Sequence, residues 1–458
     1  MSDTIAAIAT PLGEGGVSLV RISGKDSLTI ASSLFHPAQR GSLTECKPHR
    51  VYFGEIRDPE SGDCVDEVLL TFFKAPKSYT AEDVVEINGH GGVYVTSRIL
   101  QLTLDCGARL AEPGEFTRRA FMNGRIDLSQ AEAVADLIAA SSDRALTTAL
   151  SQLKGQLSGR LNYLYERLLA VQAHLEAAID FPDEGLKIQK TEETLGQLRG
   201  VRAELESLIE SYRRGKIFRE GVKVALVGKP NVGKSSLLNA LLKEDRAIVT
   251  PHPGTTRDTL EETVRVRDIH IHIIDSAGLR ENPEAIEEEG IQRTRRALGE
   301  ADLALAIFDR SQPLDANDEL LLGEVNEKPK LILLNKCDLE ARLDVEALRL
   351  RFSTAPCISV SAKTLSGLEA LYDAIHAFAV QEQQAGEAVV VTRERHRELL
   401  VRASQAVGKC CESLEQSLSE EFVAVDIQVA MESLGGILGK TVAEDLLDQI
   451  FASFCIGK

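Results

Sequence analysis

The chain has 458 residues, 43% of them hydrophobic and 27% charged, and its formal net charge is −18 at pH 7. This composition is ordinary for a globular protein, and the length predicts roughly three domains. The acidic excess argues against broad, non-specific binding of nucleic acid, so any such contact requires a local basic patch.

The sequence carries no signal for a membrane or for secretion. No apolar run reaches the ~18 residues of a membrane span, and the first residues lack the charged-then-apolar pattern of a signal peptide. The 8 cysteines are scattered and form no CxxC pair, which favours free thiols in a reducing compartment. We therefore expect a cytoplasmic protein with no membrane partner.

Residues 1–120 predict a mixed α/β domain. Runs rich in β-forming residues cover 5–10, 16–23, 67–73 and 84–88. Glu86 lies inside the last of these runs. Because an unpaired buried carboxylate is costly, Glu86 should pair with a structural cation or face a ligand that has N–H groups. The following Gly-His-Gly-Gly, residues 89–92, either binds an anion through its amides or forms a plain turn.

Helices dominate after residue 120. Leucines spaced by three and four from Leu146 to Leu168 predict one long amphipathic helix that ends at Phe181-Pro182-Asp183. A second helix is predicted over 192–214, and more helices over 393–407 and 441–454. Helices thus flank residues 216–383 on both sides. We expect 216–383 to be a domain inserted into one helical domain formed by 121–215 and 384–458.

The inserted region begins with the phosphate-loop pattern Gly-Lys-Pro-Asn-Val-Gly-Lys-Ser, residues 228–235. A strand-like run over 222–227 precedes it, and a helix-like run starts at Leu237. In this setting the loop amides bind phosphate, Lys234 reaches the β- and γ-phosphates, and the Ser235 hydroxyl binds Mg²⁺. The pattern predicts a nucleotide site.

Four further motifs follow in the order and spacing that a GTP site requires. Strands predicted over 270–274, 303–308, 331–334 and 357–360 imply a mainly parallel sheet whose ligand lies at the carboxyl ends of the strands. Asp275 ends one of them and should meet Mg²⁺ through water, and Asp338 should read guanine by accepting two N–H bonds. Asn335 braces that site, and residues 361–363 cradle the base. Thr256 is expected to be the second hydroxyl on Mg²⁺.

The hydrolytic step has no glutamine at the usual place. Leu279 follows Asp275-Ser276-Ala277-Gly278, and an apolar residue cannot orient water. Asn231 could instead hold a monovalent cation with carbonyls of residues 250–255, or it could serve only as a turn residue. An acidic run at 284–289 could orient the water, although a solvated helix face explains most of it.

The motifs together resemble those of the MnmE (TrmE) family of tRNA-modification GTPases. The resemblance extends over the whole chain. It rests on LVRISG (19–24), VVEINGHGG (84–92), PGEFTRRAFMNGRIDLSQAEAVADLI (113–138), AAIDFPDE (177–184), GKPNVGKSSLLNAL (228–241), PGTTRD (253–258), DSAGLR (275–280) and SFCIGK (453–458). It implies three parts: an N-terminal α/β folate-binding-like domain, a helical-bundle domain, and an inserted P-loop GTPase domain with a mainly parallel sheet.

The resemblance also assigns roles to individual residues. Glu287 matches the water-orienting glutamate, and Lys234 and Asn231 complete the catalytic set. The potassium positions would be Asn231, Thr250, His252 and Thr255, beside the magnesium ligands Ser235 and Thr256. Tetrahydrofolate, as the 5-formyl or 5,10-methylene form, would meet Arg21, Glu86, Arg125 and Lys458. The GTP-binding positions are Asn231, Val232, Gly233, Lys234, Ser235, Ser236, Thr250, Pro251, His252, Pro253, Gly254, Thr255, Thr256, Asp275, Ser276, Ala277, Gly278, Asn335, Lys336, Asp338, Ser361, Ala362 and Lys363.

Some positions depart from the family pattern. Arg125 stands where lysine is frequent, which keeps the charge and changes the hydrogen-bond geometry. Ser276 replaces the commoner threonine. Cys455 lies in the last motif and could be catalytic or a structural thiol.

The resemblance implies a function and its partners. The chain would be a homodimer joined through the N-terminal domain. With an MnmG-type protein that carries FAD it would form a heterotetramer that modifies carbon 5 of the wobble uridine in certain tRNAs. Basic clusters at Arg118-Arg119, Arg125 and 393–397 could touch tRNA, although solvated helix faces explain them more simply. Two alternatives are a switch GTPase that only binds RNA, and a folate enzyme that works without a partner.

Overall fold

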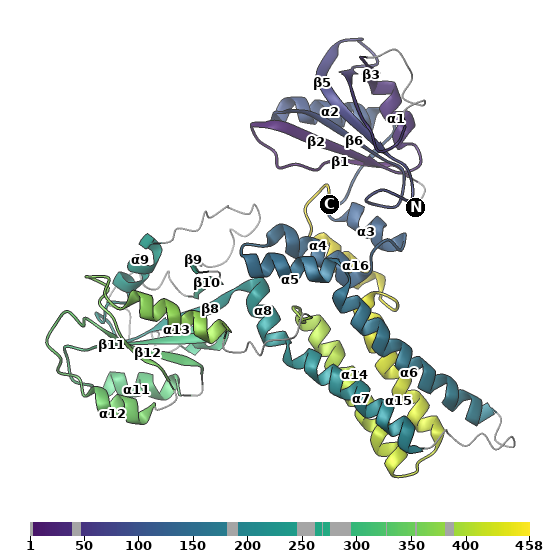
Figure 1. Cartoon of the computed structure of the whole chain (residues 1–458). Helices are drawn as coiled ribbons and strands as arrows, with labels where there is room; N and C mark the ends of the chain where they lie inside the picture. The colour runs from purple at the N-terminus through teal and green to yellow at the C-terminus, as the bar shows by residue number, and fades with distance from the viewer. Residues whose placement is uncertain are drawn as a thin grey trace. The chain divides into compact units, whose positions relative to one another are not determined.

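The computed structural model describes residues 3–38, 47–180, 191–244, 262–267, 269–274, 295–326, 328–352, 355–380 and 389–458 (Figure 1). The chain divides into two compact units. The first comprises residues 1–138, 152–205 and 399–458, and the second comprises 139–151 and 206–398. The predicted boundary near residue 120 falls inside the first unit, and the exact domain boundaries stay predictions.

The first unit contains a 7-stranded sheet in the order β3-β4-β5-β6-β2-β1-β7. Its strands are antiparallel neighbours except for β1 and β7, which run parallel. Helices α1 and α2 pack on one face, over a core that includes Ile22, Leu70 and Ile87. The strands are β1 (Ile5–Ile8), β2 (Gly15–Ser23), β3 (Phe35–Pro37), β4 (Val51–Arg57), β5 (Cys64–Phe73), β6 (Val84–Gly91) and β7 (Arg109–Leu110); the helices are α1 (Ser27–Leu34) and α2 (Val93–Asp105).

Strand register defines what the other face of this sheet presents. Arg21 on β2 lies opposite Glu86 on β6, and Glu86 lies opposite Thr71 on β5. Side chains on successive strands at paired positions share a face. At the β1 end this face is covered by Phe116 and Tyr79. At the β4 end it is open, and Phe53 is 54% exposed.

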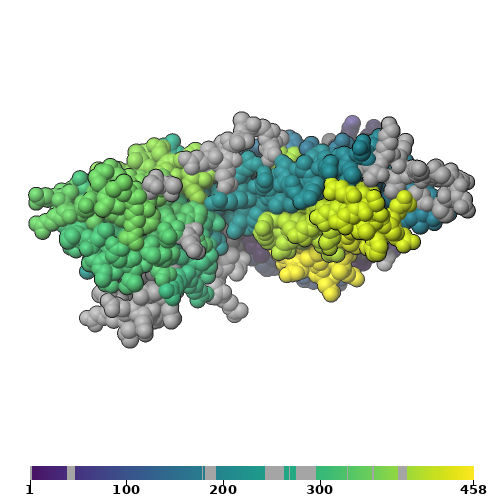
Figure 2. All heavy atoms as spheres, turned by 90° about the horizontal axis from the view of Figure 1, so that it is seen from below, coloured from purple at the N-terminus to yellow at the C-terminus, as the bar shows by residue number. Residues whose placement is uncertain are grey.

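Long helices form the rest of the first unit. Helix α15 (Glu420–Leu438) lies along α6 (Gln156–Asp180), as two perpendicular views show (Figures 1 and 2). Helices α4 (Leu128–Ala139) and α16 (Glu444–Ala452) pack together through Leu128, Leu447 and Phe451. The remaining helices are α3 (Glu115–Met122), α7 (Thr191–Glu210) and α14 (Glu394–Glu415), of which α7 and α14 run on into the second unit.

Two segments that the sequence predicts as single helices are each divided into two helices in the structure. The leucine-rich helix is divided into α5 (Asp143–Leu153) and α6, because Gly155 between them has φ +81°. That conformation favours glycine and ends a right-handed helix. The helix predicted over 192–214 ends at Glu210, and α8 (Tyr212–Glu220) follows it. Periodicity alone does not reveal these breaks, because the apolar spacing continues across them.

The second unit contains a 6-stranded sheet in the order β13-β12-β11-β8-β10-β9. All neighbouring strands are parallel except the edge strand β9, which confirms the mainly parallel sheet. Apolar clusters lie on both faces of the sheet, as such sheets require. The strands are β8 (Val222–Val227), β9 (Glu262–Val266), β10 (Ile269–Ile274), β11 (Leu303–Asp309), β12 (Lys330–Asn335) and β13 (Cys357–Ser359); the helices are α9 (Lys234–Glu244), α11 (Ala316–Glu324), α12 (Val345–Arg351) and α13 (Leu368–Val380).

Candidate functional site

The phosphate loop joins β8 to α9, as predicted. Gly233 has φ +99°, and a Cβ there would lie 2.3 Å from Asn335 Nδ2, so only glycine fits. Asn231 adopts the left-handed conformation, with φ +65°. Asparagine tolerates the left-handed conformation because its short polar side chain can hydrogen-bond locally, which supports the prediction of Asn231 as a turn residue.

Lys234 closes the loop on itself. Its ammonium group donates to the carbonyls of Gly228 at 2.6 Å and Lys229 at 3.0 Å. Burial lowers the pKa of Lys234. Among the described residues, the printed partners of this buried ammonium group are neutral carbonyls, so a phosphate would supply an opposite charge.

Asn335 joins three loops at the carboxyl ends of the strands. It ends β12 and is 2% exposed. Its Nδ2 donates to the carbonyl of Val232 in the phosphate loop at 2.7 Å, and its Oδ1 accepts from the amide of Ala362 at 3.1 Å. The predicted bracing role thus has a geometric basis: one side chain sets the spacing of the phosphate loop and the loop after β13.

The predicted guanine selector Asp338 stands beside Ser361. The Ser361 hydroxyl donates to Asp338 Oδ1 at 2.6 Å, and this bond lowers the pKa of Asp338. The carboxylate therefore stays ionised and oriented at neutral pH. The neighbouring Lys336 has φ +61° and donates to Asp309 Oδ2 at 2.6 Å, which ties this loop to the end of β11.

A second polar cluster lies in the first unit and contains Arg21, Glu86, Tyr79, Arg125 and Lys458, which we call the Arg21 cluster. Arg21 donates to Glu86 Oε1 through Nε at 2.9 Å and Nη2 at 2.8 Å. Its Nη1 donates to the carbonyl of Gly457 at 3.1 Å. Glu86 is thus paired with a structural cation, which was one of its two predicted environments.

Two guanidinium groups lie near the ring of the tyrosine in this cluster. The Arg21 guanidinium is 5.2 Å from the centre of the Tyr79 ring, and that of Arg125 is 5.1 Å away. The Tyr79 hydroxyl hydrogen-bonds the Thr117 hydroxyl at 2.8 Å. Burial lowers the pKa of Lys458, and the nearby charge of Arg21 lowers it further. Cations, a carboxylate and an aromatic face therefore converge on one place.

The sequence matches known proteins along its entire length. Two family models cover it, the GTP-binding protein TrmE N-terminus over residues 4–125 and the MnmE helical domain over residues 128–455. The tRNA modification GTPase MnmE of Moorella thermoacetica is 45% identical over 466 residues, spanning 100% of both chains. The protein of the same description from Levilactobacillus brevis is 44% identical, over 100% of this chain and 98% of its own.

This chain belongs to the MnmE family of tRNA modification GTPases. Membership fixes its architecture as a TrmE-type N-terminal domain, an MnmE helical domain and a GTPase domain, in agreement with the predicted fold class. Among solved structures, the G domain of the T. maritima FeoB iron transporter matches 34% of this chain and 98% of its own, with 29% identity and a TM-score of 0.27.

The structure brings together two groups of predicted site residues of this MnmE-family chain. The first group lies in or next to the loops at the carboxyl ends of the parallel strands and comprises Asn231, Val232, Gly233, Lys234, Ser235, Ser236, Asn335, Lys336, Asp338, Ser361, Ala362 and Lys363. The second group lies in the first unit and comprises Arg21, Glu86, Arg125 and Lys458. Outside the described residues lie Thr250, Pro251, His252, Pro253, Gly254, Thr255, Thr256, Asp275, Ser276, Ala277, Gly278 and Glu287. Among the residues that are described, no three His, Cys, Asp or Glu side chains gather to hold a metal ion.

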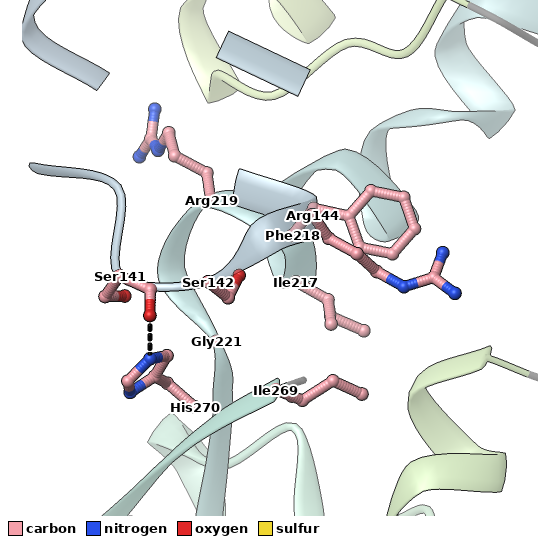
Figure 3. A pocket seen from close by; sticks show the side chains of 9 residues that line it. All are labelled: Ser141, Ser142, Arg144, Ile217, Phe218, Arg219, Gly221, Ile269 and His270. Carbon is pink, nitrogen blue, oxygen red and sulfur yellow. Dashed lines mark hydrogen bonds between the residues drawn. The ribbon is translucent and has the colours of Figure 1, made fainter. Parts of the chain in front are cut away.

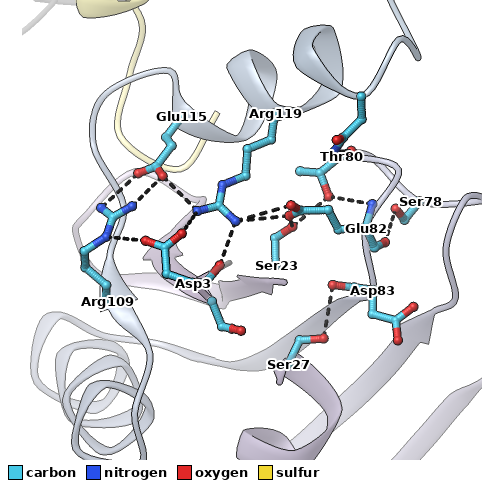
Figure 4. A network of polar contacts seen from close by, with 12 residues as sticks. Asp3, Ser23, Ser27, Ser78, Thr80, Glu82, Asp83, Arg109, Glu115 and Arg119 are labelled. Atoms are coloured by element: carbon cyan, nitrogen blue, oxygen red, sulfur yellow. Dashed lines mark hydrogen bonds and ion pairs between the residues drawn. The ribbon is translucent and has the colours of Figure 1, made fainter. Parts of the chain in front are cut away.

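Sequence reasoning missed Tyr79 and the polar network that supports it (Figure 4). The Thr80 hydroxyl hydrogen-bonds Ser23 at 2.7 Å, and Ser23 donates to Glu82 at 2.8 Å. Glu82 pairs with Arg119, which is 1% exposed and also contacts Asp3 and Glu115. This network fixes the segment that directly follows Tyr79. A tyrosine outside any motif gives no signal of such a role.

The sequence predicts Arg119 to be either a tRNA contact or part of a solvated helix face, and both interpretations are wrong for it. The side chain is buried among three carboxylates. Its neighbour Arg118 pairs with the exposed Asp448 at 2.8 Å. The helical pattern of the sequence places both arginines near a surface. Only the packing of α3 shows that Arg119 is buried whereas Arg118 remains partly exposed.

A small pocket in the second unit lies away from the nucleotide loops (Figure 3). Ser141, Ile217, Phe218, Ile269 and His270 are among its lining residues, and His270 Nε2 is 2.5 Å from the Ser141 carbonyl. The pocket is therefore at the start of β10, whereas the phosphate loop follows the end of β8, which runs parallel to β10. The pocket therefore lies at the amino ends of the parallel strands, opposite the end that carries the phosphate loop.

In the part of the chain that the structure covers, no helix is long and apolar enough to cross a membrane.

Proposed function

We propose that this chain is a potassium-dependent GTPase that modifies carbon 5 of the wobble uridine of certain tRNAs. In this proposal it works with an FAD-containing partner and takes a one-carbon unit from 5-formyl- or 5,10-methylene-tetrahydrofolate. The observation that carries the proposal is that one chain of the MnmE family holds both the GTP loops and the Arg21 cluster. The product would be an aminomethyl or carboxymethylaminomethyl group.

The GTPase half assigns tasks to described residues. Lys234 exchanges its two carbonyl partners for phosphate oxygens, and the loop amides around Gly233 bind the remaining oxygens. Asp338 would bind the N–H groups of guanine, and Ser235, the second residue of α9, would offer its hydroxyl to Mg²⁺. Glu287 would orient the attacking water.

Potassium should accelerate GTP hydrolysis strongly. We expect rates in K⁺ at least ~10-fold above those in Na⁺, because a cation near Asn231, Thr250, His252 and Thr255 would stabilise charge that develops on the phosphates. The rates are measured with both salts at equal ionic strength. Replacing Asn231 with Ala should remove most of the difference. Equal rates in the two salts would contradict the cation mechanism.

The Arg21 cluster supports the folate half. A folate carries a flat ring with amide-like donors and acceptors, and an acidic tail. Glu86 can accept from ring N–H groups, Arg21 and Lys458 can bind carboxylates, and the Tyr79 ring offers an apolar face. The residues present therefore fit the group. The folate would supply the one-carbon unit, and these side chains would bind and orient it.

Folate binding should depend on two members of the cluster. We expect Glu86→Gln and Tyr79→Ala each to weaken binding of 5-formyl-tetrahydrofolate at least ~10-fold in calorimetric titration, since each removes a charged or stacking contact. GTP hydrolysis should be unchanged. Arg98→Met is the matched control, because Arg98 pairs with Asp58 instead. Unchanged folate affinity in both cluster variants would refute the assignment.

The proposed partners follow from family membership and one surface. Val17, Val51, Phe53 and Leu69 are 73%, 63%, 54% and 46% exposed, and Phe53 lies directly opposite Leu69 on the open sheet face. Apolar side chains that share a face support a homodimer through the N-terminal sheet. In the heterotetramer, the MnmG-type partner would supply FAD and much of the tRNA-binding surface.

Mass spectrometry of wobble uridines tests the function directly. In cells that lack this protein, the carbon-5 modification should disappear, and the wild-type gene should restore it. Intact modification in those cells would overturn the proposal and favour a switch GTPase that only binds RNA. One-carbon transfer by the purified chain alone would show that it needs no FAD partner.

A further inference from the structure

The phosphate loop contains a second lysine that the nucleotide chemistry above does not use. Lys229 follows Gly228, and its side chain is 13% exposed. Its ammonium group lies 2.8 Å from Asp315 Oδ2 and 2.8 Å from Asp318 Oδ2. Both carboxylates belong to the start of α11, so the lysine joins the phosphate loop to another element.

The first turn of α11 is built to hold these two carboxylates. Asp315 is the N-cap and accepts from the amides of Asn317 and Asp318, while Asp318 Oδ2 accepts from the Asp315 amide at 3.2 Å. This reciprocal arrangement is a capping box. The orientation of both carboxylates is therefore set by hydrogen bonds within α11, independently of Lys229.

The pairing of Lys229 with Asp318 is strongly enforced. The Asp318 side chain is 3% exposed, and its Oδ1 has no hydrogen-bond partner among the described residues. Burial by itself lowers the pKa of Lys229, but the bonds to Asp315 and Asp318 outweigh it, and the net shift is upward. Removing the Lys229 charge would leave the Asp318 carboxylate buried without this counter-charge, which is costly.

The loop is consequently held at two points. At Lys229 it is tied to α11, and at Val232 its carbonyl is tied to Asn335. Between these points lies Asn231, whose φ of +65° is uncommon for any residue other than glycine. Two anchors on either side of a left-handed residue restrict the conformations that the loop can adopt.

We propose that Lys229 is a positioning residue for GTP binding. Its ion pairs with Asp315 and Asp318 hold the phosphate loop in the binding conformation without touching the nucleotide. A preorganised loop loses less conformational freedom when a ligand binds. Loss of the tether should therefore weaken GTP and GDP alike and leave the chemical step almost unchanged.

Steady-state hydrolysis and nucleotide titrations test this role. We expect Lys229→Met to raise KM for GTP and Kd for GDP by about tenfold each, with kcat within about twofold. Lys229→Arg should restore most of the affinity, because a guanidinium can reach both carboxylates. Arg351→Met is the matched control. Arg351 of α12 pairs with Glu319 of α11, the helix that also carries Asp318, and its described contacts include no phosphate-loop residue.

A double-mutant cycle separates the tether from general damage. If Lys229 acts through Asp318, the Lys229→Met/Asp318→Asn variant should bind GTP no more weakly than Lys229→Met alone. The partly exposed Asp315 provides a milder variant, Asp315→Asn, which should raise KM in the same direction even if Asp318→Asn fails to fold. Unchanged KM in Lys229→Met, an equal change in Arg351→Met, or a fully additive double variant would each overturn the proposal.

Discussion

Replacing Asp338 with Asn should lower the affinity for GTP by ~100-fold or more and make xanthosine triphosphate the preferred nucleotide. The carboxylate can accept both N–H groups of guanine, whereas the amide of asparagine offers one acceptor and one donor. An unmatched donor at the base edge costs far more than a lost contact. Ser361 holds Asp338 Oδ1 at 2.6 Å, so the carboxylate has little freedom to adapt.

Competition between the two triphosphates measures this preference. The hydrolysis rate of each nucleotide is followed in the presence of the other, in wild type and variant. Asp344→Asn is the control, because Asp344 is the N-cap of α12 and asparagine caps a helix equally well. If Asp338→Asn still prefers GTP, the base is read elsewhere.

Replacing Arg119 with Met should destabilise the first unit by about 3–5 kcal/mol, because three carboxylates would lose a buried partner. Arg119 is 1% exposed and contacts Asp3, Glu82 and Glu115. Arg118→Met on the same helix is the matched control. Its carboxylate partners Glu444 and Asp448 are exposed, so its loss should cost less than about 1 kcal/mol.

Hydrogen exchange read by mass spectrometry resolves the two units. Peptides from β1 and β2 should lose protection in Arg119→Met, and peptides from β8 and β11 should not. Equal protection of β1 in both arginine variants would contradict a structural role for the network. Folate binding should weaken as well, since the network holds the segment that directly follows Tyr79.

The same network makes the first unit sensitive to acid. Burial by itself raises the pKa of Glu115, but hydrogen bonds from Arg109, the Glu112 amide and Arg119 outweigh this effect. The pKa of Glu115 in the folded protein therefore lies below the usual 4.5. A carboxyl with a lowered folded-state pKa stabilises the fold above its unfolded pKa. That contribution is lost as the pH falls through the folded value.

The sequence predicted the second unit closely because its chemistry is local. Val222–Val227 forms β8 at the predicted bounds, and the phosphate loop, Asn335 and Asp338 lie at strand ends as expected. Short motifs between a strand and a helix carry their geometry with them. Of the expected potassium positions, only Asn231 is described; Thr250, His252, Thr255, Thr256 and Glu287 lie outside the described residues. Their roles stay predictions.

Contacts between distant segments could not be predicted in the same way. The partner of Glu86 is Arg21, 65 residues away, and nothing in either strand's pattern selects it. Tyr79 gains its place from Arg21, Arg125 and Thr117, which come from three separate segments. The edge strand β9 and the helix α15 were also missed. Their positions follow from packing, which the periodicity of one segment does not encode.

The two hydrogen bonds of Asn335, to the Val232 carbonyl and the Ala362 amide, restrict how the nucleotide preference of this enzyme can be redesigned. A variant that uses a foreign nucleotide would allow one GTPase to be switched on by itself among the many in a cell. Asn335→Asp is not a route to such a variant, because a carboxylate would face the Val232 carbonyl and disturb phosphate binding together with base recognition. Asp338, which touches no phosphate-loop residue in the described contacts, is the position at which nucleotide choice can be altered separately.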